Sequence, residues 1–149
     1  FDSLSSRYIN TALAHTEGLE LGLRAPVDNR LAFNLTYNYL IAKSDSTGLP
    51  LLRRPNHQLS AELAYSVSDQ LQTAISGRYV GDRDDVDVVT FKRLRMPPFT
   101  ILGLTANYKT SDKFKVFGRI DNLLDLTYEE VNGFGTPKRS IYLGVGYTL

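Results

Sequence analysis

Seven segments of the chain alternate between apolar and polar residues with a period of two. The clearest is 30–43, where Leu31, Phe33, Leu35 and Tyr37 fall on every second position. Alternation of this kind gives each face of a β-strand its own set of side chains, and no helical period fits it. The predicted strands span residues 7–25, 30–43, 56–66, 71–81, 99–108, 114–122 and 139–149.

The connections between these strands alternate between short turns and long loops. Outer-membrane barrels have short periplasmic turns and long outside loops, whereas a soluble β-sandwich has no reason to gather its long loops at one end. The pattern therefore predicts an all-β fold, namely an antiparallel transmembrane β-barrel. The short turns are 26–29, 67–70 and 109–113, and the long loops are 44–55, 82–98 and 123–138.

Tyrosines mark both ends of the predicted strands. A Tyr ring can be buried at a membrane interface while its hydroxyl stays wet, so two such groups are typical of the aromatic girdles of a barrel. The alternative is a soluble all-β domain with Tyr on its sheet faces. Tyr37, Tyr39 and Tyr79 lie toward the long loops, and Tyr65, Tyr108 and Tyr147 lie toward the short turns.

The second face of the strands is polar, which suits the wet or plugged lumen of a wide barrel. If the short turns are periplasmic, the last strand ends at the periplasmic rim and residue 1 lies outside the cell. Single-chain bacterial barrels have an even number of strands, so seven are expected to be the C-terminal part of a larger barrel that does not close by itself. The polar positions are Asn34, Thr36, Asn38, Gln58, Ser60, Glu62, Gln72, Ser76, Arg78, Lys115, Arg119 and Asp121.

Composition removes several classes of function. The 149 residues include 17 Lys and Arg against 16 Asp and Glu, which leaves no basic footprint for nucleic acid. Cysteine is absent, so the chain has neither a disulfide framework nor a thiolate metal site. No apolar run of about 18 residues is present, so no membrane-spanning helix is predicted, although spanning strands hide their apolar residues by alternation.

Polar clusters offer little catalytic chemistry. An acidic patch at Asp82, Asp84, Asp85 and Asp87 has the hard oxygens that calcium prefers, but its spacing is not that of an EF-hand, and a solvated loop is favoured.

Other polar residues are interpreted as structural. His15 and His57 are isolated and predict no metal site. Asp121 and Asp125 lie near Arg119, where a salt-bridge network at a strand end is expected rather than a catalytic carboxylate pair. No enzyme is predicted.

The end of the chain carries a family resemblance. Residues 119–128 read R-I-D-N-L-L-D-L-T-Y, and a terminal strand at 139–149 reads R-S-I-Y-L-G-V-G-Y-T-L. Together they resemble the end of TonB-dependent outer-membrane receptors, whose hallmark is N-L-F-D-x-x-Y, with Leu124 here in place of Phe. Three further segments resemble the cobalamin-receptor branch of that family: Tyr8-Ile-Asn10, Glu17-Gly-Leu-Glu20 and Pro50-Leu-Leu-Arg-Arg54.

The resemblance implies that residues 1–149 are the C-terminal part of a barrel of about 22 strands, with 132–149 as the terminal-strand signature. The complete receptor would contain an N-terminal plug, absent from this chain, whose TonB box engages TonB to drive import. Outer-membrane lipid and the barrel assembly machinery, through the last strand, are further implied partners. No cofactor is expected in this segment, because calcium loops in similar receptors lie earlier in the barrel.

The resemblance also implies a ligand contact at Arg53, because the first Arg of the Leu-Leu-Arg-Arg segment contacts ligand in the cobalamin branch. A planar guanidinium can bind amide or phosphate oxygens of a large polar ligand. The competing interpretation makes Arg53 and Arg54 solvated loop charges or lipopolysaccharide contacts. Phe91 is the only aromatic residue in 82–98, and no motif aligns it with an aromatic ligand contact of the family.

The predicted function is TonB-dependent import of cobalamin through the outer membrane. A siderophore or haem receptor is the near alternative, and a passive porin-like barrel is a further one. A surface adhesin or a barrel enzyme forms a third class, and the enzyme would need a catalytic constellation in the lumen.

Overall fold

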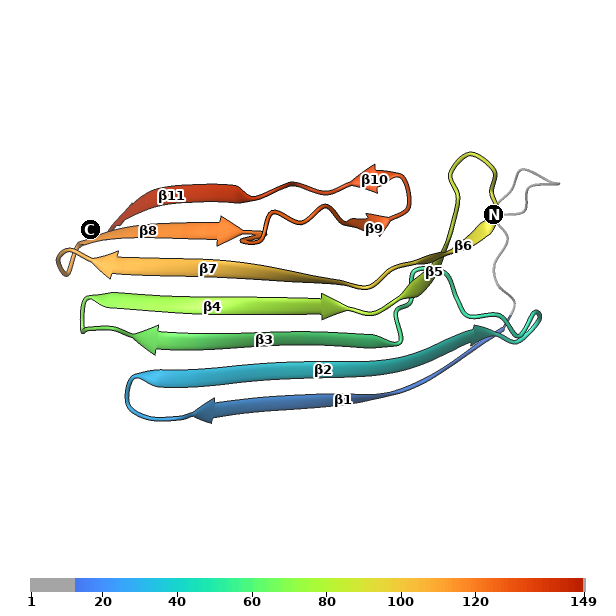
Figure 1. Cartoon of the computed structure of the whole chain (residues 1–149). Coiled ribbons are helices and arrows are strands. Elements are labelled where there is room, and N and C mark those ends of the chain that lie inside the picture. The colour runs from blue at the N-terminus through green and yellow to red at the C-terminus, as the bar shows by residue number, and fades with distance from the viewer. Residues whose placement is uncertain (1–12, 149) are drawn as a thin grey trace.

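The computed structural model describes residues 13–148, and every regular element in that range is a β-strand. Seven long strands form one antiparallel sheet in which each pairs with the next long strand along the chain (Figure 1). No helix among the described residues is long and apolar enough to cross a membrane. In sheet order the strands are β1 (Ala14–Pro26), β2 (Leu31–Ser44), β3 (His57–Ser66), β4 (Leu71–Val80), β7 (Phe99–Lys109), β8 (Phe114–Asp121) and β11 (Ser140–Tyr147).

The predicted strands are confirmed where the structure describes them. The segment predicted at 30–43 is β2, and the segment predicted at 114–122 is β8, with ends that shift by a single residue. The first predicted strand, 7–25, begins before the described range, so the resemblance at Tyr8 and Asn10 lies outside the described residues. Leu149 lies outside them as well.

Two of the long loops contain short hairpins that alternation does not reveal. Strands β5 (Arg83–Val86) and β6 (Arg93–Met96) pair with each other, and so do β9 (Glu129–Val131) and β10 (Phe134–Gly135). The turn after β5 is closed by Asp87, whose Oδ1 accepts the backbone N–H groups of Val89 at 3.0 Å and Thr90 at 2.6 Å. Strands of two to four residues are too short to show a period, which is why these segments are predicted as plain loops.

All three short turns lie at one end of the sheet and all three long loops at the other (Figure 1). In the first turn, Oδ1 of Asp28 accepts the N–H groups of Arg30 at 2.6 Å and Leu31 at 2.8 Å. In the second turn, Oγ of Ser68 accepts the N–H of Leu71 at 3.1 Å. Asp and Ser favour such turns because their side chains bond the backbone two or three residues on. The predicted asymmetry of the connections is confirmed.

The tyrosines occupy the ends that the pattern predicts. Beside a short turn, Tyr147 pairs in register with Phe114, the first residue of β8. At the long-loop end, the ring of Tyr39 lies 5.1 Å from the ring of His57, and the hydroxyl of Tyr37 lies 2.8 Å from its Nδ1. His57 is therefore part of an aromatic cluster at the loop end of the sheet.

The apolar face of the sheet is uncovered. Leu21 keeps 54% of its surface exposed and Leu143 keeps 82%. Among the described residues, the buried hydrophobic side chains are Ala42, Val80 and Met96, so this part of the chain has no core of its own. An apolar face of this extent needs a lipid covering, as on the outside of a membrane barrel.

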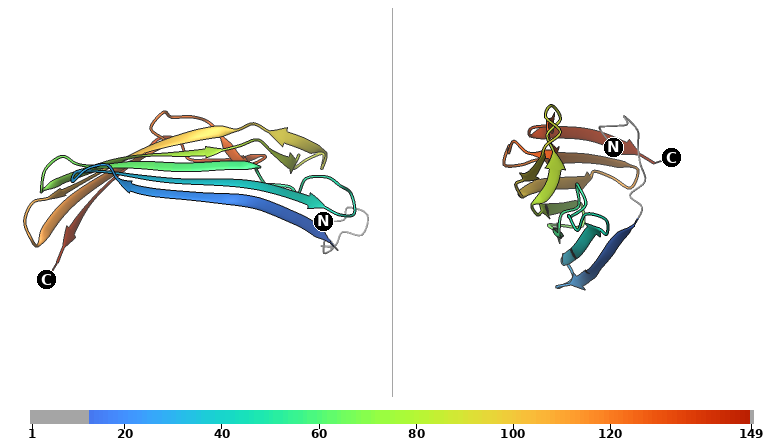
Figure 2. Two further views of the ribbon diagram at one scale, coloured as in Figure 1. Left: turned by 90° about the horizontal axis from the view of Figure 1, so that it is seen from below. Right: turned by 90° about the vertical axis from the view of Figure 1, so that its right-hand side faces the viewer.

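The opposite face is polar, and the sheet is curved and open, with β1 and β11 at its two edges (Figure 2). Nε of Arg24 donates to Oδ1 of Asn34 at 3.0 Å, and Nδ2 of Asn34 donates to Oε1 of Glu62 at 3.3 Å, so polar side chains are linked across three strands. A hollow of about 580 Å³ lies on this face. The predicted polar lumen face is confirmed, and the seven strands do not close into a barrel.

Candidate functional site

The three long loops meet at Asp85. They are the first long loop (residues 45–56), the second (81–98) and the third (122–139). The side chain of Asp85 is fully buried. Its Oδ1 accepts Nε–H of Arg53, in the first long loop, at 2.9 Å and the N–H of Val86 at 2.8 Å, and its Oδ2 accepts the N–H of Asn132, in the third long loop, at 2.8 Å. Arg53, Asp85 and Asn132 are called the Asp85 cluster below.

Hydrogen bonds keep Asp85 ionised inside this cluster. Burial raises the pKa of its carboxyl, but the hydrogen bonds from the Asn132 N–H, the Arg53 guanidinium and the Val86 N–H outweigh burial and hold the pKa below its usual 3.8. A buried carboxylate is stable only when it is paired and hydrogen-bonded in this way. Asp85 therefore joins the three loops as long as all of its partners stay in place.

Arg83 makes a second connection between the second and third long loops. Its buried guanidinium donates from Nη2 to the carbonyl oxygens of Glu129 at 2.5 Å and Glu130 at 2.9 Å, and from Nη1 to that of Pro97 at 3.4 Å. It also lies over the ring of Phe99, 5.3 Å from the centroid. Burial lowers the pKa of Arg83, against the opposing effect of the nearby carboxylates. A planar guanidinium can meet several carbonyls and a ring at once, which a lysine could not do.

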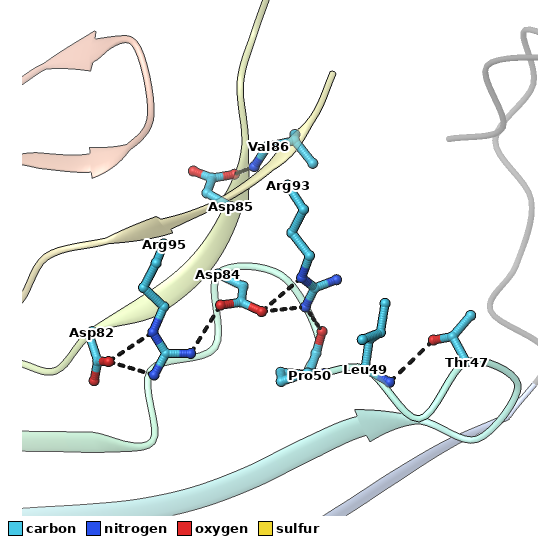
Figure 3. Close-up of polar contacts among 9 residues, drawn as sticks. All are labelled: Thr47, Leu49, Pro50, Asp82, Asp84, Asp85, Val86, Arg93 and Arg95. Atoms are coloured by element: carbon cyan, nitrogen blue, oxygen red, sulfur yellow. Dashed lines mark hydrogen bonds and ion pairs between the residues drawn. The ribbon is translucent and has the colours of Figure 1, made fainter. Parts of the chain in front are cut away.

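Two further acidic residues of the second long loop, Asp82 and Asp84, pair with arginines across its hairpin (Figure 3). Oδ2 of Asp82 accepts Nε–H of Arg95 at 2.8 Å, and Oδ1 of Asp84 accepts Nη1–H of Arg95 at 3.0 Å. Oδ2 of Asp84 accepts Nε–H of Arg93 at 2.7 Å, and Arg93 also donates to the carbonyl oxygen of Pro50 in the first long loop. Burial raises the pKa of Asp84, but its bonds to Arg93 and Arg95 prevail and lower it.

The prediction of a solvated acidic loop is wrong for Asp84 and Asp85. Both carboxylates are engaged by arginines, and only Asp87 sits at the exposed turn of the hairpin. Asp84 and Arg95 lie 11 residues apart in the chain, and the pairing of β5 with β6 brings their opposite charges together. Within residues 13–148, no group of three or more His, Asp and Glu side chains is arranged to hold a metal ion.

Arg53, the predicted ligand contact, is held at both its backbone and its side chain. Its φ of 58° lies in the left-handed region, which non-glycine residues seldom adopt. Its N–H donates to the carbonyl oxygen of Asp84 at 2.7 Å, and its Nε–H is bound by Asp85. Both Arg53 and Arg54 are exposed. Arg53 is thus an exposed residue whose Nε is paired with Asp85, and its contact with a ligand stays a prediction.

A hollow of about 240 Å³ lies beside Arg53 on the long-loop end of the sheet. Within the described residues, no hydrogen bond of Arg53 uses its Nη atoms, and its side chain keeps 46% of its surface exposed. The hollow can offer charged donors together with an aromatic edge to a ligand group. Its lining includes Arg53, Gln58, Arg78, Arg83, Phe99 and Glu130.

Three of the four residues that the N-L-x-D-x-x-Y pattern specifies have a structural role here. Asn122 is buried at a φ of 52°, where Nδ2 donates to the carbonyl oxygen of Leu126 at 2.8 Å and Oδ1 accepts the Leu126 N–H at 3.0 Å. Oδ1 of Asp125 accepts the N–H of Arg139 at 2.9 Å, which lowers the pKa of Asp125. The ring of Tyr128 packs at a tilt against the ring of Phe99. The segment fixes both ends of the third long loop.

The predicted network around Arg119 is confirmed only in part. Nε of Arg119 lies 3.1 Å from Oδ1 of Asp121, and its guanidinium covers the ring of Tyr142 at 4.6 Å. Asp125 does not join this pair, because it turns toward the backbone of Arg139.

The sequence analysis predicts no individual role for Arg83 or Asp85. Asp85 was visible only as one member of an acidic patch, and its partner Asn132 lies 47 residues away. One local signal was available. Arg83 and Asp85 are two residues apart and so share one face of a strand, and both are buried while Asp84 between them is not.

Comparison with known proteins places this geometry in context. Residues 1–123 match the family described as TonB dependent receptor-like, beta-barrel. The vitamin B12 transporter BtuB of Vibrio cholerae serotype O1 is 33% identical over 105 residues, which are 69% of this chain and 17% of that protein. The chain thus spans about a sixth of the length of this relative.

Solved structures share the fold. The copper transporter OprC has a TM-score of 0.78 at 22% identity, covering 91% of this chain and 24% of its own. The Escherichia coli K12 ferric-catecholate import receptor Fiu has a TM-score of 0.77 at 16% identity, and the match covers 90% of this chain and 21% of that receptor. The ferripyoverdine receptor of the Pseudomonas aeruginosa outer membrane has a TM-score of 0.75 at 20% identity, and the match covers 90% of this chain and 19% of that receptor. At these identities the likeness concerns the fold alone.

Proposed function

The chain belongs to the TonB-dependent receptor β-barrel family and lies in the outer membrane, and from this premise we propose that it carries part of the binding site of a cobalamin importer. In this proposal residues 1–149 are the C-terminal part of the barrel, and 132–149 are its terminal-strand signature. An N-terminal plug elsewhere in the receptor engages TonB, and the barrel assembly machinery recognises the last strand. The ligand binds on the outer side and is released into the periplasm.

The observation that carries this proposal is the geometry of Arg53. Its Nε is bound inward by Asp85, and its half-exposed guanidinium borders the hollow under the long loops. Amide and phosphate oxygens are the acceptors that a guanidinium binds best, and a corrinoid carries both. The sequence relationship to a vitamin B12 transporter favours this ligand class over siderophores, because the structural likeness to siderophore and copper receptors concerns the fold alone.

The test is calorimetry with the complete receptor in detergent, using cyanocobalamin as ligand and a ferric siderophore as control. We expect cyanocobalamin to bind and the siderophore to give no heat. Arg53→Ala should weaken cyanocobalamin binding by roughly tenfold or more, since a charge-assisted hydrogen bond is lost. Arg54→Ala, one residue away and exposed, is the matched control and should bind like the unaltered receptor.

Each outcome separates one part of the proposal from another. No cyanocobalamin binding by a correctly folded barrel would send the function to another ligand of TonB-dependent receptors. Binding that is equal in the Arg53→Ala and unaltered receptors would keep the cobalamin assignment and remove Arg53 from the site.

A further inference from the structure

The side chain of Arg53 is divided between two environments. Its Nε faces the fully buried carboxylate of Asp85 at 2.9 Å, while its outer atoms border the hollow of about 240 Å³. The same carboxylate accepts the N–H of Asn132 at 2.8 Å through its second oxygen. The group that orients Arg53 is therefore also the group that holds the third long loop in place.

The other two arginines of the hollow are engaged to different degrees. Arg78 forms an ion pair with Glu130, and Arg83 donates to the carbonyl oxygens of Glu129 and Glu130. Within the described residues, the Nη atoms of Arg53 make no hydrogen bond, and Arg78 makes one through Nη2 alone, so Arg53 is one of two arginines with donors left for a ligand. The geometry suits one acceptor group with one or two oxygens, such as a carboxamide or a phosphodiester.

A long side chain that is free to rotate loses entropy when it binds a ligand, and this loss weakens binding. Asp85 removes part of that loss in advance, because it fixes the guanidinium through Nε. The backbone of Arg53 is fixed as well, since its N–H donates to the carbonyl oxygen of Asp84 at 2.7 Å. Both contacts come from the second long loop, which is 31 or 32 residues later in the chain than Arg53.

We propose that Asp85 is a positioning residue for ligand binding: it holds the Arg53 guanidinium toward the hollow and couples that orientation to the third long loop through Asn132. This inference rests on the proposed function, in which Arg53 contacts the ligand. The ligand does not touch Asp85. Its affinity depends on Asp85 only through Arg53, and all three long loops share one arrangement when the ligand is bound.

The test is a double-mutant cycle in the complete receptor, with cyanocobalamin as probe. Asp85→Asn is expected to weaken binding by about tenfold when Arg53 is present, and by less than about twofold when Arg53→Ala is already in place. A carboxylate that merely stabilises the fold would cost the same factor in both backgrounds, and that result would overturn the inference. Asp82→Asn is the matched control, since Asp82 pairs with Arg95 within the same hairpin, and it should bind normally.

A ligand-free readout keeps the inference testable if cyanocobalamin does not bind. Trypsin cleaves after Arg53 but not after Arg54, because Pro55 follows Arg54. We expect Asp85→Asn to speed cleavage of the Arg53–Arg54 bond at least severalfold, while Asp82→Asn leaves the rate unchanged. Unchanged cleavage in Asp85→Asn would show that Asp85 does not hold Arg53, whatever the ligand is. Absence of cobalamin binding alone would overturn the proposed function and leave this result standing.

Discussion

The ring of Phe99, the first residue of β7, packs against the ring of Tyr128 in the third long loop, with 4.6 Å between their centroids. The guanidinium groups of Arg78 and Arg83 lie over the same Phe99 ring at 5.4 Å and 5.3 Å. The third long loop is thus attached to the rim of the sheet by an aromatic contact, independently of the Asp85 cluster. A tilted ring pair flanked by cations is a favourable arrangement for this purpose.

Replacing Phe99 with Ala should loosen the third long loop. The lost ring contact is worth about 0.5–1.5 kcal/mol beyond buried area, so amide hydrogens of residues 128–135 should exchange up to roughly tenfold faster. Hydrogen-exchange mass spectrometry of the complete receptor measures this directly. Phe91→Ala is the control, because Phe91 lies exposed at the tip of the β5–β6 hairpin and should leave exchange unchanged. Equal protection in Phe99→Ala would mean that the ring pair does not anchor the loop.

Two glycines of β1 should respond to alanine in opposite directions. A Cβ at Gly18 would lie 2.3 Å from the carbonyl oxygen of Tyr39, so the β1–β2 backbone must shift, at a cost of about 1–3 kcal/mol. A Cβ at Gly22 meets nothing within 4 Å, and Ala there should stabilise by up to about 1 kcal/mol, since Gly is unfavourable inside a strand. Guanidinium unfolding of the receptor in detergent compares the two. Equal midpoints for both variants would contradict the predicted close approach.

Asn122 combines a left-handed backbone with a side-chain bridge, and two variants separate these roles. Asn122→Ala loses the bonds to Leu126 and strains the φ of 52°, so a loss of roughly 2–4 kcal/mol is expected. Asn122→Gly loses the same bonds but tolerates the φ, so it should cost clearly less. The unfolding free energy in detergent gives both values. If the glycine variant proves as unstable as the alanine variant, backbone conformation plays no part at this position.

The Asp85 cluster should be insensitive to pH near neutrality. Because the folded-state pKa of Asp85 lies below its usual 3.8, the cluster contributes stability that is fully present above that value and is lost as pH falls through the lower folded pKa. The protection factor of the Asn132 amide, corrected for intrinsic exchange, should therefore stay constant from about pH 8 to pH 5. A change in protection between pH 5 and pH 7 would assign the cluster to a different titrating group.

The barrel wall could be predicted from sequence because its side chains face lipid on one side and a polar lumen on the other. The apolar face of β2 can therefore be read from the every-second spacing of Leu31, Phe33 and Leu35. The turns that reverse the chain are indicated by Asp28 and Ser68. These are local signals, so the strand ends were correct to within a residue or two between positions 26 and 147.

The loop contacts could not be predicted in the same way. Asp85 bonds Arg53 and Asn132, which are 32 and 47 residues away in the chain. The alternation of apolar and polar residues predicts strands, but it does not predict contacts between distant loops. The sequence predicts solvated acidic residues, because charge in a long loop is usually exposed. Here successive residues of β5 point to opposite sides, so Asp85 is buried while Asp84 is not, and Asp87 lies beyond the strand at the turn.

The joining of the three long loops at Asp85 limits how chimeric receptors can be built from this protein. Grafting the second long loop alone from another receptor would leave Arg53 and the Asn132 amide without their shared acceptor. The transplantable unit is the trio of residues 45–56, 81–98 and 122–139, while the strands between them can stay as a common scaffold. Exchange of ligand preference within the family should then succeed by whole sets of loops rather than by single ones.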